Sequence, residues 1–236
     1  MRPAVSVCLV LALGACNGTE PDADVIPVEV QWMEWPAEVL AATPFTARLT
    51  GYGVSCQEVL KFDPAPRVDN SAVTFEPFYL VTGEPGPCPL RDYGAGQGVP
   101  QAGHPISILV PMFDTRASVP GLEAQNPRLY EMRAAASVYA REGGAAPALP
   151  VRTFGDITVR SDVASAARTN AGGNGYAYRE SPGCVRLSAA GVYPGYIVEN
   201  PPDTASYWYG FVRGYLYEPA AKLCGESRVF RVVSIY

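Results

Sequence analysis

The sequence predicts an all-β protein, and three observations lead to that prediction. The chain of 236 residues contains 23 glycines and 23 prolines, a composition that favours turns and short strands over long helices. Short segments alternate apolar with polar residues, which is the period of a half-buried β-strand. Clusters of proline and glycine at residues 84–87 and 94–98 separate such segments. Because 48% of the residues are hydrophobic, the chain is not expected to be intrinsically disordered.

Five segments in the first two thirds of the chain are predicted strands. Most of them alternate, and one is a continuous apolar run bounded by prolines, as expected for a buried strand. This spacing resembles the architecture of an immunoglobulin-like β-sandwich, which we expect over residues 25–161. The resemblance is one of architecture only, because the Cys-Trp-Cys signature of immunoglobulin domains is missing. The predicted strands are residues 28–32, 45–50, 73–76 with an extension toward Tyr79, 106–110 and 153–160.

Residues 127–142 fit either a helix or a strand. As a helix, the segment has Asn126 as its N-cap, Pro127 at its first position and Gly143 as its stop. As a strand, it places alternate apolar side chains on one face. We favour the strand, because the segment follows a turn and precedes the predicted strand at 153–160, like the last hairpin of a sandwich.

The C-terminal part offers five further strand candidates. Five short strands fit a small β-barrel that resembles the OB fold, which we expect over residues 175–236. Small and polar residues at 162–174, which lead into Ala171-Gly172-Gly173-Asn174-Gly175, are interpreted as a linker between the two domains. The five candidates are residues 176–179, 184–188, 192–199, 207–217 and 228–235.

The N-terminal residues have the pattern of an export leader that ends in a cysteine. An apolar run over residues 3–13 is too short to span a bilayer as a helix. It closes with Leu13-Gly14-Ala15-Cys16, which resembles the lipobox of bacterial lipoproteins. The resemblance implies that residues 1–15 are removed as a signal peptide and that lipid on Cys16 anchors the protein. Residues 16–24 are then a polar, lipidated tether.

The residue after the lipobox cysteine bears on the destination of the protein. In enterobacterial lipoproteins an aspartate there favours the inner membrane, so by this resemblance Asn17 implies the outer membrane of the cell envelope, if the host has one. The chain has a net charge of −5, whereas nucleic-acid-binding proteins usually carry an excess of basic residues. We therefore expect contact with the membrane through Cys16, an envelope protein or a glycan as partner, and no nucleic acid.

The cysteines fit an oxidising compartment. Cys8 is lost with the leader and Cys16 carries lipid, which leaves four, an even number. We expect the first two and the last two of these to form disulfides, because each pair then lies within one predicted domain. Disulfides are favoured over a metal site because no CxxC or Cys-His spacing exists. The four are Cys56, Cys88, Cys184 and Cys224.

Residue types that could catalyse a reaction are not arranged in a recognisable pattern. His104 is interpreted as an exposed turn residue, and no serine lies in a G-x-S-x-G elbow. Nothing in the sequence pairs two carboxylates as glycoside hydrolysis requires. We therefore predict no catalytic residue, metal or cofactor, and a non-catalytic binding or structural role. A secreted hydrolase or a carbohydrate-active accessory protein is the alternative.

The richest candidate surface is the predicted strand at 207–217, which contains six aromatic residues among eleven. Alternation puts Trp208, Val212 and Leu216 on one face and five aromatic rings on the other. A barrel has one interior, so one set must face solvent, a partner or the other domain. We favour packing between the domains for the five rings over a stacking platform for a glycan. They belong to Tyr207, Tyr209, Phe211, Tyr215 and Tyr217.

Overall fold

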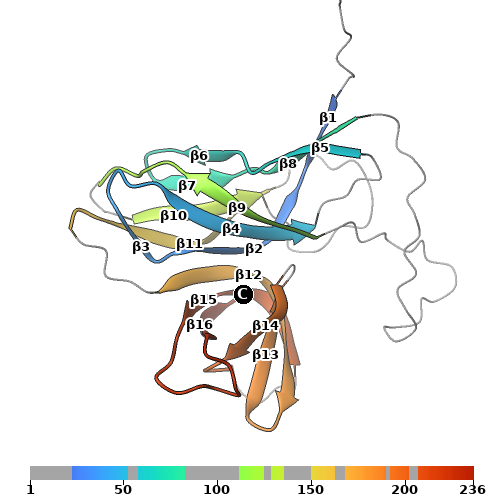
Figure 1. The fold of residues 1–236 in the computed structure, drawn as a ribbon, viewed down its shortest axis with the longest axis vertical. Helices are drawn as coiled ribbons and strands as arrows, with labels where there is room; N and C mark the ends of the chain where they lie inside the picture. The colour runs from blue at the N-terminus through green and yellow to red at the C-terminus, as the bar shows by residue number, and fades with distance from the viewer. Residues whose placement is uncertain are drawn as a thin grey trace, which may run out of the picture.

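The computed structural model describes residues 23–52, 58–82, 112–124, 129–135, 150–162, 168–189, 192–201 and 207–236. Within these ranges the regular elements are sixteen β-strands, so the all-β prediction is confirmed. No helix in the described ranges is long and apolar enough to cross a membrane. Two units are visible in Figure 1, a layered unit above and a smaller one below it.

The layered unit contains the first eleven strands (Figure 1). They are β1 (Ala23–Pro27), β2 (Glu29–Pro36), β3 (Glu38–Leu40), β4 (Phe45–Tyr52), β5 (Glu58–Asp63), β6 (Pro66–Val68), β7 (Ala72–Phe75), β8 (Phe78–Thr82), β9 (Met112–Val119), β10 (Leu129–Ala135) and β11 (Val151–Arg160). The second unit, called the closed unit here, contains β12 (Thr169–Ser181), β13 (Cys184–Ala189), β14 (Val192–Val198), β15 (Tyr207–Tyr217) and β16 (Val229–Ile235).

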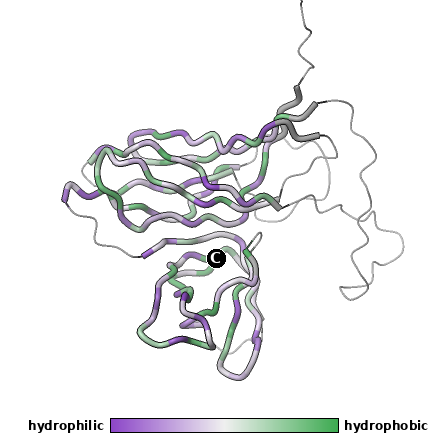
Figure 2. The backbone as a smooth tube through the Cα atoms, viewed as in Figure 1, coloured by the Kyte–Doolittle hydropathy of each residue, from purple (hydrophilic) through white to green (hydrophobic). Residues whose placement is uncertain are grey.

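Two sheets face each other in the layered unit. One has the strand order β3-β11-β10-β7-β6, and strands β2, β4 and β9 of another sheet pack against it. The core between them contains Trp35 and Leu49 from one side and Phe75, Met132 and Phe154 from the other. A third, three-stranded sheet has the order β1-β8-β5. Hydrophobic and hydrophilic residues alternate along the strands of both units (Figure 2), as half-buried strands require.

Three sequence expectations for this unit have different outcomes. The described part of segment 127–142 is strand β10, as favoured, and its Tyr130, Met132 and Ala134 face the core. The segment from 73 toward Tyr79 forms two strands, β7 and β8, because Pro77 between them has no N–H for a sheet hydrogen bond. The predicted strand at 106–110 and the turn residue His104 lie outside the described residues.

The five strands of the closed unit pair in a complete circle. The order is β12-β13-β14-β16-β15 and back to β12, with β14 and β16 parallel and the other neighbours antiparallel. All five strands predicted in this part of the chain are confirmed. A second hydrophobic core fills the circle, with Leu187, Val212, Leu216 and Phe230 among its residues.

A disulfide between Cys184 and Cys224 joins the start of β13 to the segment before β16. This bond confirms one of the two predicted pairs. A closed loop of this length stabilises the fold by about 3–4 kcal/mol if the effect is chain entropy. Cys56 and Cys88 of the other predicted pair, and Cys16, lie outside the described residues.

The prediction of a linker at 162–174 is wrong for its second half, because β12 begins at Thr169. One edge of β12 pairs with β2 at residues 169–173 and with β13 from Gly175 onward, while the other edge pairs with β15. One sheet of eight strands, β13-β14-β16-β15-β12-β2-β4-β9, therefore runs through both units. The units share a strand at the place where a flexible connection was expected. The predicted tether is also too long, because β1 begins at Ala23.

The two units exchange aromatic side chains where they meet. Trp32 of β2 lies in the core of the closed unit, with its ring centroid 5.5 Å from that of Phe230. Phe211 of β15 lies in the core of the layered unit, 5.1 Å from Phe154 in an edge-to-face arrangement. The alternation at 28–32 predicts a half-buried strand, but six successive residues of β2 are buried because the closed unit covers its outer face.

Candidate functional site

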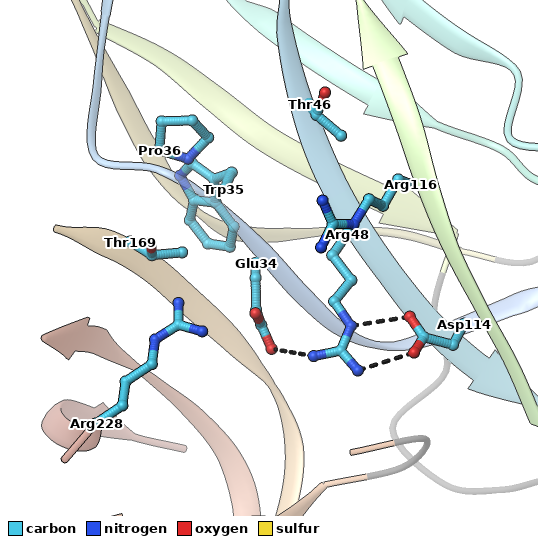
Figure 3. Close-up of a pocket in the computed structure, with 9 residues that line it drawn as sticks. All are labelled: Glu34, Trp35, Pro36, Thr46, Arg48, Asp114, Arg116, Thr169 and Arg228. Carbon is cyan, nitrogen blue, oxygen red and sulfur yellow. Dashed lines mark hydrogen bonds and ion pairs between the residues drawn. The ribbon is translucent and has the colours of Figure 1, made fainter. Parts of the chain in front are cut away.

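A depression where the two units meet is the candidate functional site (Figure 3). Its volume of about 520 Å³ is of the size of small-ligand sites, which span about 300–1,000 Å³. Strands β2, β4 and β9 form one side, and β12 and the residue before β16 contribute to the other. The lining residues are Glu34, Trp35, Pro36, Thr46, Arg48, Asp114, Arg116, Thr169 and Arg228.

The register of three neighbouring strands brings the charged side chains of this depression together. Glu34 of β2 lies opposite Arg48 of β4, and Arg48 lies opposite Arg116 of β9. Residues in register share one face of a sheet, as do residues two apart on a strand, so Thr46 and Asp114 join this face. The opposite face of the same strands packs into the core of the layered unit.

Arg48 bridges two carboxylates at the base of the site (Figure 3). Its Nε and Nη2 donate to Oδ1 and Oδ2 of Asp114 at 2.8 and 2.9 Å, and its Nη1 donates to Glu34 Oε1 at 3.2 Å. Such a two-pronged pair fixes the direction of both side chains. The hydrogen bonds that Arg48 donates to Asp114 raise the pKa of Arg48, although partial burial opposes that shift. Arg48 in turn lowers the pKa of Asp114.

Glu34 is one of the residues through which polar contacts join the two units. It is 6% exposed, and its Oε1 also accepts hydrogen bonds from Trp32 Nε1 at 3.2 Å and from the Tyr196 hydroxyl of β14. Burial, reinforced by the nearby Glu34 carboxylate, raises the pKa of Tyr196 well above its usual value. The Tyr196 phenol therefore keeps its proton at neutral pH and remains a donor to Glu34.

Arg116 and Arg228 are the exposed cations of the depression, and neither forms an ion pair within the described part of the chain. Arg116 belongs to β9 on the side of the layered unit, and Arg228 extends from the side of the closed unit (Figure 3). With three arginines and two carboxylates, the lining has a formal charge of +1. That local excess contrasts with the net charge of −5 of the whole chain.

The site gathers two carboxylates that the sequence did not pair, Glu34 and Asp114. In glycoside hydrolysis one carboxyl group must be protonated to act as the general acid, while the other attacks or activates water. Here Arg48 favours the ionised form of Asp114, and three donors of the fold converge on Glu34 Oε1. The geometry is that of a structural ion bridge. Among the described residues, no group of three or more His, Cys, Asp or Glu could hold a metal ion.

The aromatic face predicted on β15 is divided among different environments. Phe211 is buried in the layered unit, whereas Tyr209 is 59% exposed. Tyr215 and Tyr217 are half-buried, and the guanidinium of Arg168 lies 4.2 Å from the ring centroid of Tyr215. The side chain of Tyr207 is outside the described part. The described rings of this face are therefore not one continuous exposed surface.

Replacing Asp114 with asparagine is expected to remove a pH-dependent part of the stability. Because Arg48 depresses the folded-state pKa of Asp114, the pair stabilises the fold above the unfolded-state pKa of about 3.9 and loses this effect as the pH falls through the folded value. At pH 7 the loss should be at most about 1 kcal/mol, because water screens a half-exposed carboxylate.

Urea denaturation of the parent and the Asp114→Asn variant at neutral pH and in acid measures this effect. The difference between the two proteins should shrink as the pH is lowered. A difference that is the same at both pH values would show that the ion pair with Arg48 does not cause it.

No sequence motif marks this site, because its residues come from strands far apart in the chain. A usable signal is Glu34 itself, a charged residue between Trp32 and Trp35, just after the predicted strand at 28–32. Comparison with models of protein families, with curated proteins and with solved structures finds no match for this chain.

Proposed function

We propose that the chain is a lipid-anchored, non-catalytic binding protein of a bacterial cell envelope, and that it binds a ligand in the depression between its two units. The observation that carries the binding role is the depression, with its two exposed arginines, Arg116 and Arg228. A site built on paired strands is held in one geometry by the sheet, which lowers the entropy lost on binding.

The leader and the disulfide support the envelope location. The Leu13-Gly14-Ala15-Cys16 sequence resembles a lipobox, and an acylated cysteine with more than one chain gives stable membrane attachment. The Cys184–Cys224 bond fits an oxidising compartment outside the cytoplasm. Asn17 after the cysteine favours the outer membrane over the inner one, so the expected partners are an envelope protein or a glycan.

The strand orders support a finer fold assignment. The sheet β3-β11-β10-β7-β6 facing β2, β4 and β9 is consistent with an immunoglobulin-like sandwich, from which the parallel β7–β10 pair departs. The closed unit, whose first strand pairs with its second and fourth, fits a small OB-like barrel. Barrels of that kind often bind saccharides and other extended polar ligands, which agrees with a binding role.

The lipid anchor is tested by replacing Cys16 with serine. Incorporation of a radiolabelled acyl chain should be lost, and the protein should leave the membrane fraction, because no acyl chain can then hold it there. The matched control is Cys8→Ser, which changes a cysteine of the predicted leader and should leave labelling intact. Unchanged membrane retention of the Cys16→Ser protein would refute the anchor.

One observation favours a second candidate, a secreted hydrolase or carbohydrate-active accessory protein. Glu34 and Asp114 meet in a depression of ligand size, as a pair of catalytic carboxylates would. Their shared bond to Arg48 supports the binding role instead. Release of reducing sugar from envelope glycans by the parent, and its loss in Asp114→Asn, would favour the hydrolase.

A further inference from the structure

We propose that the depression binds an acidic saccharide, whose carboxylate or phosphate is held by Arg116 and Arg228. The proposal rests on the proposed function, because it names the ligand class of the same site. It depends on three features of the lining, which are its charge, its neutral polar groups and its rigidity.

The charge of the lining favours an anion. The two acidic side chains of the site are both committed to Arg48 through hydrogen bonds of 2.8 to 3.2 Å. Arg116 and Arg228 therefore remain as exposed guanidinium groups that make no ion pair with a described residue. Guanidinium groups present several N–H donors in one plane, which match the oxygens of a carboxylate or phosphate.

The neutral part of the lining favours a ligand with hydroxyl groups. Thr46 and Thr169 offer hydroxyls that both donate and accept hydrogen bonds. Pro36 of β2 also lines the depression and offers an apolar surface to the C–H groups of a sugar (Figure 3). A volume of about 520 Å³ suits a small saccharide better than a lone inorganic ion.

The floor of the site is fixed before any ligand arrives. Arg48 is held by both Asp114 and Glu34, and Glu34 is held from the other unit by Tyr196 and from its own strand by Trp32. The two walls that carry Arg116 and Arg228 are thus tied to one another. The backbone positions from which the two arginines extend are therefore held at a separation set by the fold, which lowers the entropy lost when a ligand bridges them.

Calorimetric titration of the detergent-purified protein with three sugars tests the proposal. The probes are glucuronate, glucose 6-phosphate and neutral glucose, with inorganic phosphate as a fourth. At least one acidic sugar should bind at least about tenfold more tightly than glucose. A charge-assisted hydrogen bond contributes about a factor of ten in affinity or more. The acidic sugar should also bind more tightly than inorganic phosphate, which cannot use the hydroxyls of the lining.

Two variants and a matched control locate the binding. Arg116→Gln and Arg228→Gln should each lower the affinity for the acidic sugar at least about tenfold. Both variants should keep the circular dichroism spectrum of the parent, which shows that they fold. Arg179→Gln, which removes an exposed arginine of β12 outside the lining, should change nothing. Preference for glucuronate identifies a carboxylate ligand, and preference for glucose 6-phosphate identifies a phosphate ligand.

Other results would overturn the proposal. Equal affinity for glucose, absence of binding by any probe, or full binding by both arginine variants would each do so. If inorganic phosphate binds as well as the acidic sugars, the saccharide assignment is wrong. The lipid anchor is tested independently by labelling of Cys16. Labelling can succeed while the titration fails, and the titration can succeed while labelling fails, so the two results refute different proposals.

Discussion

Replacing Trp32 with alanine should lower the free energy of unfolding by about 3–5 kcal/mol, the usual loss for an emptied aromatic core site. The side chain is completely buried. It leaves β2 of the layered unit and fills the core of the closed unit, with ring centroids 5.5 Å from Phe230 and 6.2 Å from Tyr196. Its Nε1 also donates to Glu34 Oε1, so the variant loses a hydrogen bond to a buried carboxylate. Urea denaturation followed by circular dichroism measures the change.

Tyr209→Ala is the control for this experiment. It also removes an aromatic side chain, but one that is 59% exposed, and should change stability by less than about 0.5 kcal/mol. Because Trp32 joins the two cores, the parent is expected to unfold in a single transition. Equal losses in the two variants would mean that Trp32 does not fill the second core.

Most strands could be predicted from the sequence because their signal is local. Alternation of apolar and polar residues marked β4 and β15, and clusters of proline and glycine marked where strands end. The same argument mispredicted the burial of β2, which alternates over residues 28–32 yet is buried on both faces. The layer that covers its outer face comes from residues 168 and beyond, and no local pattern contains that contact.

The aromatic strand β15 shows where alternation stops being informative. The two-residue period correctly placed Trp208, Val212 and Leu216 on one face and the other rings on the opposite face. The first three face the core of the closed unit. The period could not say that Phe211 would enter a second core while Tyr209 stayed in solvent. Those environments depend on the point at which the layered unit crosses β15.

The candidate site was beyond prediction for a related reason. Nothing in the sequence singles out Asp114, and Arg48 stands at a polar position of the alternating strand predicted at 45–50. Their bidentate pair depends on the register of β4 with β9, and the bond from Tyr196 to Glu34 depends on the packing of the two units. No local pattern in the sequence predicts either of these two contacts.

The glycine-rich stretch at 171–175 was misread because linkers and closely packed strands share that composition. In the structure these residues belong to β12, at the point where its edge passes from β2 to β13. Asn174 donates a hydrogen bond of 2.7 Å to Gln31 Oε1, and both side chains are buried. Glycine is needed here because the backbone of β12 lies against the backbone of β2.

Gly173→Ala distinguishes the two interpretations and should destabilise the protein by at least about 3 kcal/mol. A Cβ at this position would lie 2.0 Å from the carbonyl oxygen of Gln31, and the φ of +146° is itself unfavourable for alanine. Gly183→Ala is the matched control, since Gly183 has a φ of +79° but open space around it. It should cost only the backbone strain, about 1–2 kcal/mol. Urea denaturation of both variants gives the comparison. If residues 171–175 were a flexible linker, Gly173→Ala would leave the free energy of unfolding nearly unchanged. That result would contradict the close packing of β12 against β2.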